Sequence, residues 1–124
     1  MRITELRVGG IEEFPAGAHK VVRVGRNRKI GVFNIRGTLY ALPNLCPHQT
    51  GPLCEGRSLT GTLQAKPGER GNWDFEWVMD GEVVVCPWHG LEFHVPTGRC
   101  LAFSEIKLRA YQVVVVGGDV LVRI

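Results

Sequence analysis

The sequence lacks a long hydrophobic run. None of its apolar stretches approaches the roughly 18 to 20 residues that a membrane-spanning helix needs, and residues 1–10 lack the apolar segment of a secretory signal. We therefore expect a cytoplasmic protein without membrane contact, in a compartment where thiols stay reduced. Helical periodicity is also scarce, and residues 102–110 could supply one helical turn at most.

Strong charge of either sign is missing as well. The formal net charge is +3, and the positive residues are scattered apart from a short basic stretch at residues 23–29. That stretch has no interleaved aromatic residues, which single-stranded nucleic acid would need for stacking. We expect no nucleic-acid partner and interpret the stretch as a solvated hairpin turn. A mildly basic protein would favour a partner with an acidic face.

Glycine and proline, by contrast, are abundant, with 16 and 7 residues. They separate short runs rich in valine, isoleucine and aromatic residues, a pattern typical of strands joined by tight turns. The predicted strands are residues 19–25, 29–35, 38–42, 75–79, 82–86, 110–116 and 119–124. Asp80-Gly81 and Gly117-Gly118 stand between such runs and predict hairpin turns, because glycine accepts the positive φ that these turns require.

Together these features predict one all-β domain over residues 1–124, an antiparallel β sandwich or barrel. Residues 64–76 are polar and rich in glycine and charge, so we expect a long exposed loop there. Two interpretations of that segment stay open: a long hairpin, which surface connections tolerate well, and a loop that docks on a partner.

Two boxes of the sequence combine cysteine and histidine. Box one, residues 45–53, contains Cys46 and His48, and box two, residues 85–93, contains Cys86 and His89. Two neighbouring hairpin tips could bring these two thiols and two imidazoles together as metal ligands. The tight Cys-x-His spacing is unusual for structural zinc, although zinc stays open on these residues alone. The matched proline and glycine neighbours argue against buried cysteines without a metal.

The paired motifs, "CPH" and "CPWHG", resemble those of the Rieske iron–sulfur proteins, whose [2Fe–2S] cluster has two histidines in place of two cysteines on one iron. The stretches "CPHQTGPL", "CPWHGLEFHVPTGR" and "VFNIRGTLYALPNLCPH" look like those of the bacterial dioxygenase-type members. The resemblance implies one cluster, with Cys46 and Cys86 on one iron and His48 and His89 on the other. It also implies a Rieske-type fold with a small cluster-binding subdomain of two hairpin loops, about residues 44–98.

The resemblance further implies a soluble one-electron carrier, a ferredoxin that passes electrons from a reductase to a terminal oxygenase and has no catalytic residue of its own. His19 and His94 are the remaining histidines, so we expect no second iron site. Two alternatives stay open. One is a small subunit of a larger oxidoreductase such as a nitrite reductase, and the other is a non-catalytic metal-binding or sensor module.

Departures from the family pattern carry further expectations. Respiratory members have a disulfide between the boxes, but Gly51 and Trp88 occupy those positions here. We expect Trp88 to cover the cluster or pack against the protein. High-potential members carry hydroxyl groups where this chain has Leu91 and Phe93, so the reduction potential should lie near the low end of the Rieske range of about −150 to +300 mV.

Two cysteines lie outside both boxes. Cys54 and Cys100 are expected to be reduced and partly buried thiols, because a reducing cytosol disfavours disulfides. Nothing in the sequence supports a bridge between them.

Overall fold

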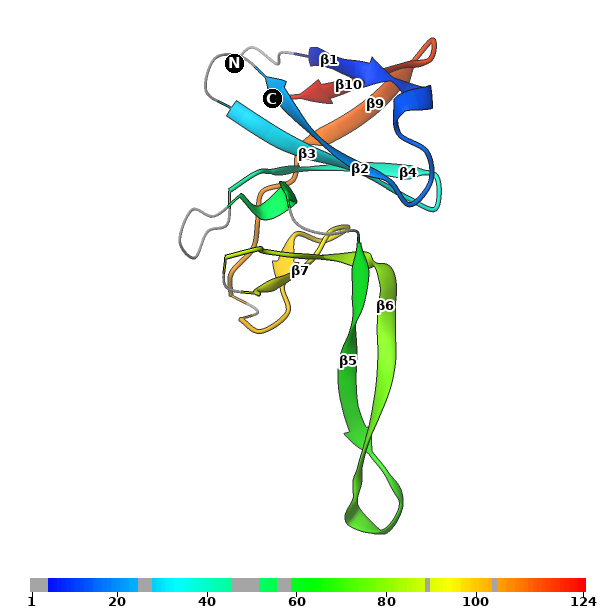
Figure 1. Cartoon of the computed structure of the whole chain (residues 1–124), viewed down its shortest axis with the longest axis vertical. Coiled ribbons are helices and arrows are strands. Elements are labelled where there is room, and N and C mark those ends of the chain that lie inside the picture. The colour runs from blue at the N-terminus through cyan, green and yellow to red at the C-terminus, as the bar shows by residue number, and fades with distance from the viewer. Residues whose placement is uncertain (1–4, 25–27, 46–51, 56–58, 89, 104) are drawn as a thin grey trace.

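The computed structural model describes residues 5–24, 28–45, 52–55, 59–88, 90–103 and 105–124 (Figure 1). Ten strands make up most of this described part: β1 Glu5–Gly10, β2 His19–Val24, β3 Arg28–Ile35, β4 Thr38–Pro43, β5 Thr60–Pro67, β6 Trp73–Val85, β7 Glu92–His94, β8 Arg99–Cys100, β9 Gln112–Val116 and β10 Asp119–Arg123. The helical elements found there are short 3₁₀ turns: η1 Ile11–Glu13, η2 Leu53–Glu55 and η3 Glu69–Gly71.

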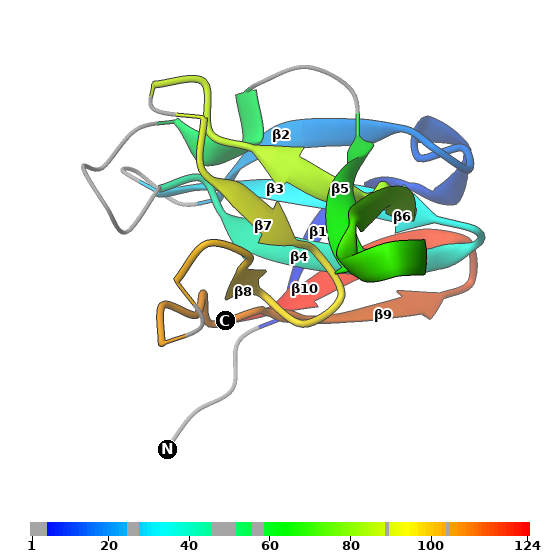
Figure 2. The same ribbon diagram turned by 90° about the horizontal axis from the view of Figure 1, so that it is seen from below.

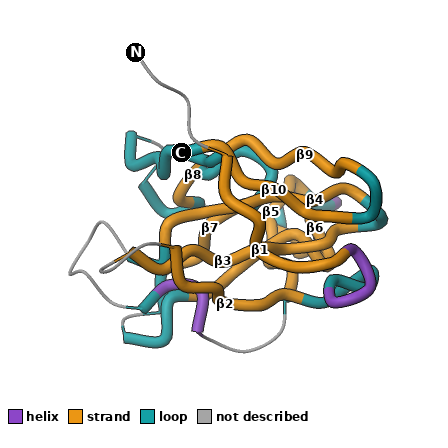
Figure 3. Tube along the Cα trace, turned by 90° about the horizontal axis from the view of Figure 1, so that it is seen from above, coloured by secondary structure: helices purple, strands orange, loops and turns teal. Residues whose placement is uncertain are grey.

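All strand pairs are antiparallel and form three sheets, with the orders β1-β10-β9, β2-β3-β4 and β5-β6-β7-β8. Strands dominate the tube drawing of Figure 3. The prediction of an all-β antiparallel fold is therefore confirmed. The predicted strands at 19–25, 29–35, 38–42, 110–116 and 119–124 match β2, β3, β4, β9 and β10 within two residues, whereas β1 was not predicted.

The first two sheets form the body of the protein, drawn in the upper half of Figure 1. Apolar side chains of both sheets pack between them, including the fully buried Ile30, Val32, Val120 and Val122. A second buried cluster joins the body to the third sheet, since it combines Phe33 of β3 with Phe93 of β7. The third sheet is thereby anchored on the β2-β3-β4 sheet, which Figure 2 shows behind it.

The hairpin turns of the body follow the glycine pattern. Arg36 and Gly37, between β3 and β4, both have positive φ values of 52° and 92°. Gly117 and Gly118, between β9 and β10, have φ values of 58° and 84°. Two consecutive residues with positive φ are typical of a type I′ turn, whose twist matches that of the flanking strands. The turn predicted at Gly117-Gly118 is confirmed.

The hairpin turn predicted at Asp80-Gly81 is wrong. Residues 73–85 form the single strand β6, in which Met79 and Gly81 have φ values of 55° and 75°. The register moves from Thr62↔Val78 to Thr60↔Val83, so β6 carries extra residues here. This is a large bulge, and the positive φ of glycine serves to bend the strand instead of reversing it. The residues after the bulge then pair with β7.

Residues 64–76, predicted as a long loop, belong mostly to strands. β5 and β6 pair continuously from Thr62↔Val78 to Pro67↔Trp73 and form a long hairpin. The hairpin projects away from the body, drawn in green at the bottom of Figure 1. Its polar residues alternate with apolar ones on a ribbon that is exposed on both faces, so composition alone suggested a loop. The hairpin interpretation is the one that the structure confirms.

Candidate metal centre

The two ends of box one are held together by a buried asparagine. β4 leads into Asn44, whose Oδ1 accepts a hydrogen bond of 2.7 Å from the backbone N–H of Cys54. The Nδ2 of Asn44 donates to Glu55 Oε2 at 2.6 Å. These bonds close the loop at its base, with η2 against the end of β4. Cys46 and His48 lie outside the described residues, so their placement stays a prediction.

The base of box one lies directly on strand β3. Gly31 faces Cys54, and a Cβ atom added to Gly31 would lie 2.5 Å from Cys54 Sγ and closer still to Cys54 Cβ. Since real Cβ atoms do not approach that closely, only glycine allows η2 to pack here. Sequence analysis did not identify Gly31, although a glycine within a predicted strand often marks a close approach of another backbone.

The thiol of Cys54 is part of the hydrophobic core. It is fully buried, and its Sγ lies 3.6 Å from the carbonyl oxygen of Pro43. Burial raises the pKa of this thiol to about 12, with a smaller contribution from the charge of Glu55. In this packing Cys54 is a neutral thiol. Cys54, Cys86 and Cys100 are free cysteines, which confirms that Cys54 and Cys100 do not form a bridge.

Box two is a hydrogen-bonded hairpin tip. Cys86 follows β6 directly, and its backbone N–H donates to Leu91 O at 2.8 Å. Its carbonyl accepts from the N–H of Gly90 at 2.9 Å, and the φ of 71° at Gly90 closes the turn. His89 lies outside the described residues. Trp88 is 57% exposed and does not pack fully against the described residues, and its cover of the cluster stays a prediction.

The two boxes converge on the same buried cluster. Leu53 at the end of box one, Cys54 directly after it, and Cys86 and Phe93 of box two all belong to it. Box one contains Cys46 and His48, and box two contains Cys86 and His89. This donor set, two thiols and two imidazoles, fits a Rieske cluster. No other group of three potential metal ligands occurs within the described ranges.

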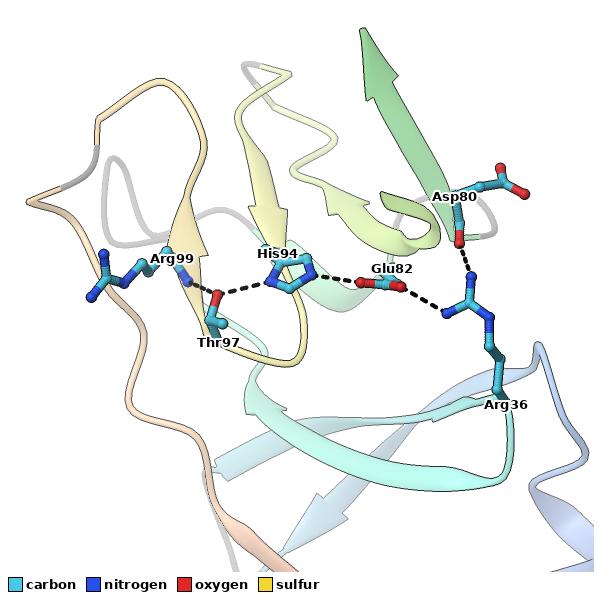
Figure 4. Close-up of polar contacts among 6 residues, drawn as sticks. All are labelled: Arg36, Asp80, Glu82, His94, Thr97 and Arg99. Carbon is cyan, nitrogen blue, oxygen red and sulfur yellow. Dashed lines mark hydrogen bonds and ion pairs between the residues drawn. The ribbon is translucent and has the colours of Figure 1, made fainter. Parts of the chain in front are cut away.

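A polar network fastens the third sheet to the body (Figure 4). His94 Nε2 lies 2.7 Å from Glu82 Oε1, and His94 Nδ1 lies 2.9 Å from Thr97 Oγ1. Arg36 donates from Nη1 to Glu82 Oε2 at 2.7 Å and from Nη2 to the carbonyl of Asp80 at 2.6 Å. Both ring nitrogens of His94 are therefore engaged, in agreement with the expectation that His94 is not a metal ligand.

The same network favours the ionised form of Glu82. Its hydrogen bond with His94, followed by that with Arg36, holds the pKa of Glu82 below its ordinary value of 4.5. A charged Glu82 bridges the bulge of β6 to the β3–β4 turn. Sequence analysis did not identify this network, because its residues are separated by up to 61 positions, from Arg36 to Thr97.

A basic pocket lies beside the strand that leads into box one. Its volume is about 520 Å³. Three cationic side chains and an aromatic ring line it together with the end of β4: Arg23, Arg28, Lys29, Tyr111, Pro43, Asn44 and Leu45. Leu45, the residue before Cys46, is exposed. Positive charge is thus concentrated next to one of the two loops.

None of the described helices is long and apolar enough to cross a membrane.

Comparison with known proteins places these features in a family. The Rieske [2Fe-2S] domain family matches residues 4–112. The "3-phenylpropionate/cinnamic acid dioxygenase ferredoxin subunit" of Escherichia coli K12 is 26% identical over 113 residues, which are 90% of this chain and 86% of that protein. The ferredoxin of carbazole 1,9a-dioxygenase from Nocardioides aromaticivorans IC177 is 27% identical with a TM-score of 0.67, over 96% of both chains.

A different kind of protein shares the fold. A putative NADH-dependent nitrite reductase small subunit from Mycobacterium tuberculosis superposes with a TM-score of 0.69, over 100% of this chain and 97% of that chain. Its identity of 15% makes this a likeness of fold alone. The family match spans both boxes, the strands β1 to β8 and the start of β9, and it confirms the resemblance and the single [2Fe-2S] cluster inferred from the motifs. The chain therefore belongs to the Rieske [2Fe-2S] domain family.

Proposed function

We propose that this protein is a one-electron carrier that passes electrons from a reductase to a terminal oxygenase through its Rieske cluster. The observation that carries the proposal is the near-complete mutual coverage with a dioxygenase ferredoxin subunit, 90% of this chain and 86% of that protein. The shared part is thus almost the whole of a known carrier. The bound cluster supplies reversible one-electron chemistry.

We assign Cys46 and Cys86 to one iron and His48 and His89 to the other. Support comes from the convergence of the two box bases on one buried cluster. The other described candidates lie outside the paired motifs: Cys54 packs against Gly31 of β3, and both nitrogens of His94 are engaged.

The residues around box two are suited to a low-potential carrier. Leu91 packs against the hydrophobic core that joins the third sheet to the body, and Phe93 is fully buried within that core. Neither side chain has a hydroxyl to donate to a sulfur, so negative charge on the sulfurs is relieved less after reduction. We propose a potential near the low end of the range of about −150 to +300 mV.

The basic pocket beside box one is suited to an acidic partner surface. Arg28 and Lys29 are exposed at its rim, and complementary charge accelerates the encounter of two proteins. We place the carrier in the cytoplasm, because free thiols such as Cys54 and Cys100 stay reduced in that compartment.

A reconstituted electron-transfer chain tests the function. The protein, loaded with its cluster, is added to NADH, the reductase component and the oxygenase component of a 3-phenylpropionate dioxygenase. Turnover should depend on this protein and should be lost in Cys86→Ser. Purification from its native source tests the second candidate, the small subunit of a nitrite reductase, which has the same fold. A stoichiometric complex with a large reductase subunit would support that candidate over a diffusing carrier.

A further inference from the structure

The β5–β6 hairpin presents a continuous apolar face that the described chain leaves uncovered. We call the part of this hairpin beyond the bulge, residues 62–78, the arm (Figure 1). Its largest apolar side chains are more than half exposed: Leu63 at 64%, Trp73 at 65%, Phe75 at 66% and Trp77 at 53%. Large aromatic side chains at such exposure are rare on a protein that has no partner for them.

The pairing register shows that these side chains share one face. Directly opposite residues of an antiparallel pair project to the same side of the sheet, and alternate residues do so along each strand. The pairs Leu63↔Trp77, Ala65↔Phe75 and Pro67↔Trp73 therefore line one face. The opposite face carries the polar pairs Gln64↔Glu76 and Lys66↔Asp74. The arm is thus amphipathic, and its apolar face is ready to pack.

The area of this face is comparable to the largest apolar patch of a typical monomer. Given their exposed fractions and the roughly 150–250 Å² that such side chains can bury, the aromatic residues and Leu63 expose on the order of 400–600 Å². The largest apolar patch on a typical monomer is about 300–600 Å² and is often functional. A two-stranded hairpin is also only marginally stable in water by itself, and packing of an apolar face is what stabilises it.

We propose that the apolar face of the arm is the contact surface between two copies of this chain, packed face to face about a twofold axis. An identical apolar face is the simplest complement to a face without charged groups. Two such faces would bury on the order of 800–1,200 Å², which reaches up to the lower limit of a specific interface. The charged groups, including the ion pair between Lys66 and Glu76, would stay in water on the outer faces.

Other occupants fit the arm less well. Anionic bilayer surfaces attract cationic segments, whereas the arm and its tip contain Glu69, Asp74 and Glu76 against Lys66 and Arg70. The bulge also turns the arm away from the segment that leads to Cys86 (Figure 1). Pairing through the arm would therefore leave the box-two end of each copy accessible to a redox partner. The proposal does not depend on the proposed electron-transfer function.

Sedimentation velocity of the cluster-loaded protein, from low micromolar to several hundred micromolar, tests the proposal. The wild type should shift with concentration towards twice the chain mass of 13.8 kDa. Phe75→Lys places a charge in the centre of the face and should leave the protein monomeric throughout. Gln64→Lys is the matched control, because it introduces the same charge on the opposite face of the same arm. Visible absorption of the cluster verifies that both variants are folded.

Tryptophan fluorescence gives an independent readout. Acrylamide should quench the wild type less at high concentration, when Trp73 and Trp77 are covered, and this protection should be absent in Phe75→Lys. A wild type that stays monomeric overturns the proposal, as does a dimer that resists Phe75→Lys or that is also lost in Gln64→Lys. A monomer whose oxygenase-coupled turnover falls in Phe75→Lys alone would assign the face to the redox partner. Cosedimentation of a monomer with phosphatidylcholine–phosphatidylglycerol vesicles would assign it to a bilayer.

Discussion

Replacing Gly31 by alanine should loosen the base of box one. Gly31 lies in the centre of β3 and faces Cys54 so closely that an added methyl group would overlap both Cβ and Sγ of that residue. Cys54 cannot shift freely, because its backbone N–H is bound to Asn44 Oδ1 at 2.7 Å. Overpacking of a buried site costs about 1–3 kcal/mol, and a rigid neighbour places this site in the upper part of that range.

The net destabilisation should be about 2 kcal/mol, since alanine in a strand recovers roughly 0.5 kcal/mol of the entropy that glycine loses. For a domain of this size the thermal midpoint should fall by about 10 °C. Circular dichroism of the cluster-loaded protein, heated at one scan rate, measures the shift. Gly37→Ala is a useful comparison, because its φ of 92° imposes strain but no atom lies within 4 Å of the added Cβ.

The clash itself is tested by a double-variant cycle. Cys54→Gly removes both overlapping atoms, whereas Cys54→Ala removes only Sγ. Gly31→Ala should therefore cost much less in the Cys54→Gly background, and only somewhat less in the Cys54→Ala background, with a coupling on the order of 1–2 kcal/mol. The reasoning is refuted if Gly31→Ala leaves the midpoint unchanged, or if its cost is the same in all three backgrounds.

Three further predictions concern charge and reactivity. The pKa of Glu82 is lowered in the folded protein. The contribution of Glu82 to stability is therefore complete above the ordinary pKa of 4.5 and is lost as the pH falls through the lowered pKa of the folded state. Glu82→Gln should flatten the acid limb of a stability–pH curve measured by urea unfolding. The Cys54 thiol, with a pKa of about 12, should resist iodoacetamide at pH 8 in the folded protein, as read by mass spectrometry, and react after unfolding. The double variant Arg28→Glu/Lys29→Glu should slow electron transfer to an acidic partner at least tenfold at low salt, by loss of electrostatic steering, as measured by stopped-flow absorption.

Each of these has a contradicting result. An acid limb that is equally steep in Glu82→Gln would mean that the network of Figure 4 contributes nothing to the pH dependence. Alkylation of folded Cys54 at the rate of a free thiol would contradict its burial. Equal rates for the charge-reversed and wild-type proteins, with the same salt dependence, would show that the partner docks elsewhere.

The body of the fold could be predicted from local patterns. Strands β2, β3, β4, β9 and β10 show runs of apolar residues in the sequence, and glycine pairs such as Gly117-Gly118 mark a turn between them. The predicted and observed bounds therefore agree for these strands. Asp80-Gly81 shows where this reasoning ends. The same dipeptide suits a turn or a bulge, and the choice depends on pairing of the following strand with β7, a contact that no local pattern contains.

The arm and the base of box one could not be predicted for related reasons. The arm alternates polar and apolar residues, but its charged residues and glycines are typical of a loop. The long pairing of β5 with β6, which makes it a hairpin, cannot be seen in its composition. Gly31, Asn44 and Glu82 act through partners distant in the sequence. Cys46, His48, Cys86 and His89 are predicted as ligands from the resemblance of their motifs, and of these the structure describes Cys86, which is buried directly after β6.

The most direct test of the central claim is electron paramagnetic resonance of the anaerobically purified, dithionite-reduced protein, combined with iron and acid-labile sulfide analysis. We predict two irons and two sulfides per chain. The reduced protein should give a rhombic signal whose average g value lies below that of all-cysteine [2Fe–2S] ferredoxins, and the signal should be lost in Cys86→Ser and His89→Ala. A colourless, signal-free protein that contains zinc, or a normal Rieske signal in Cys86→Ser, would contradict the account.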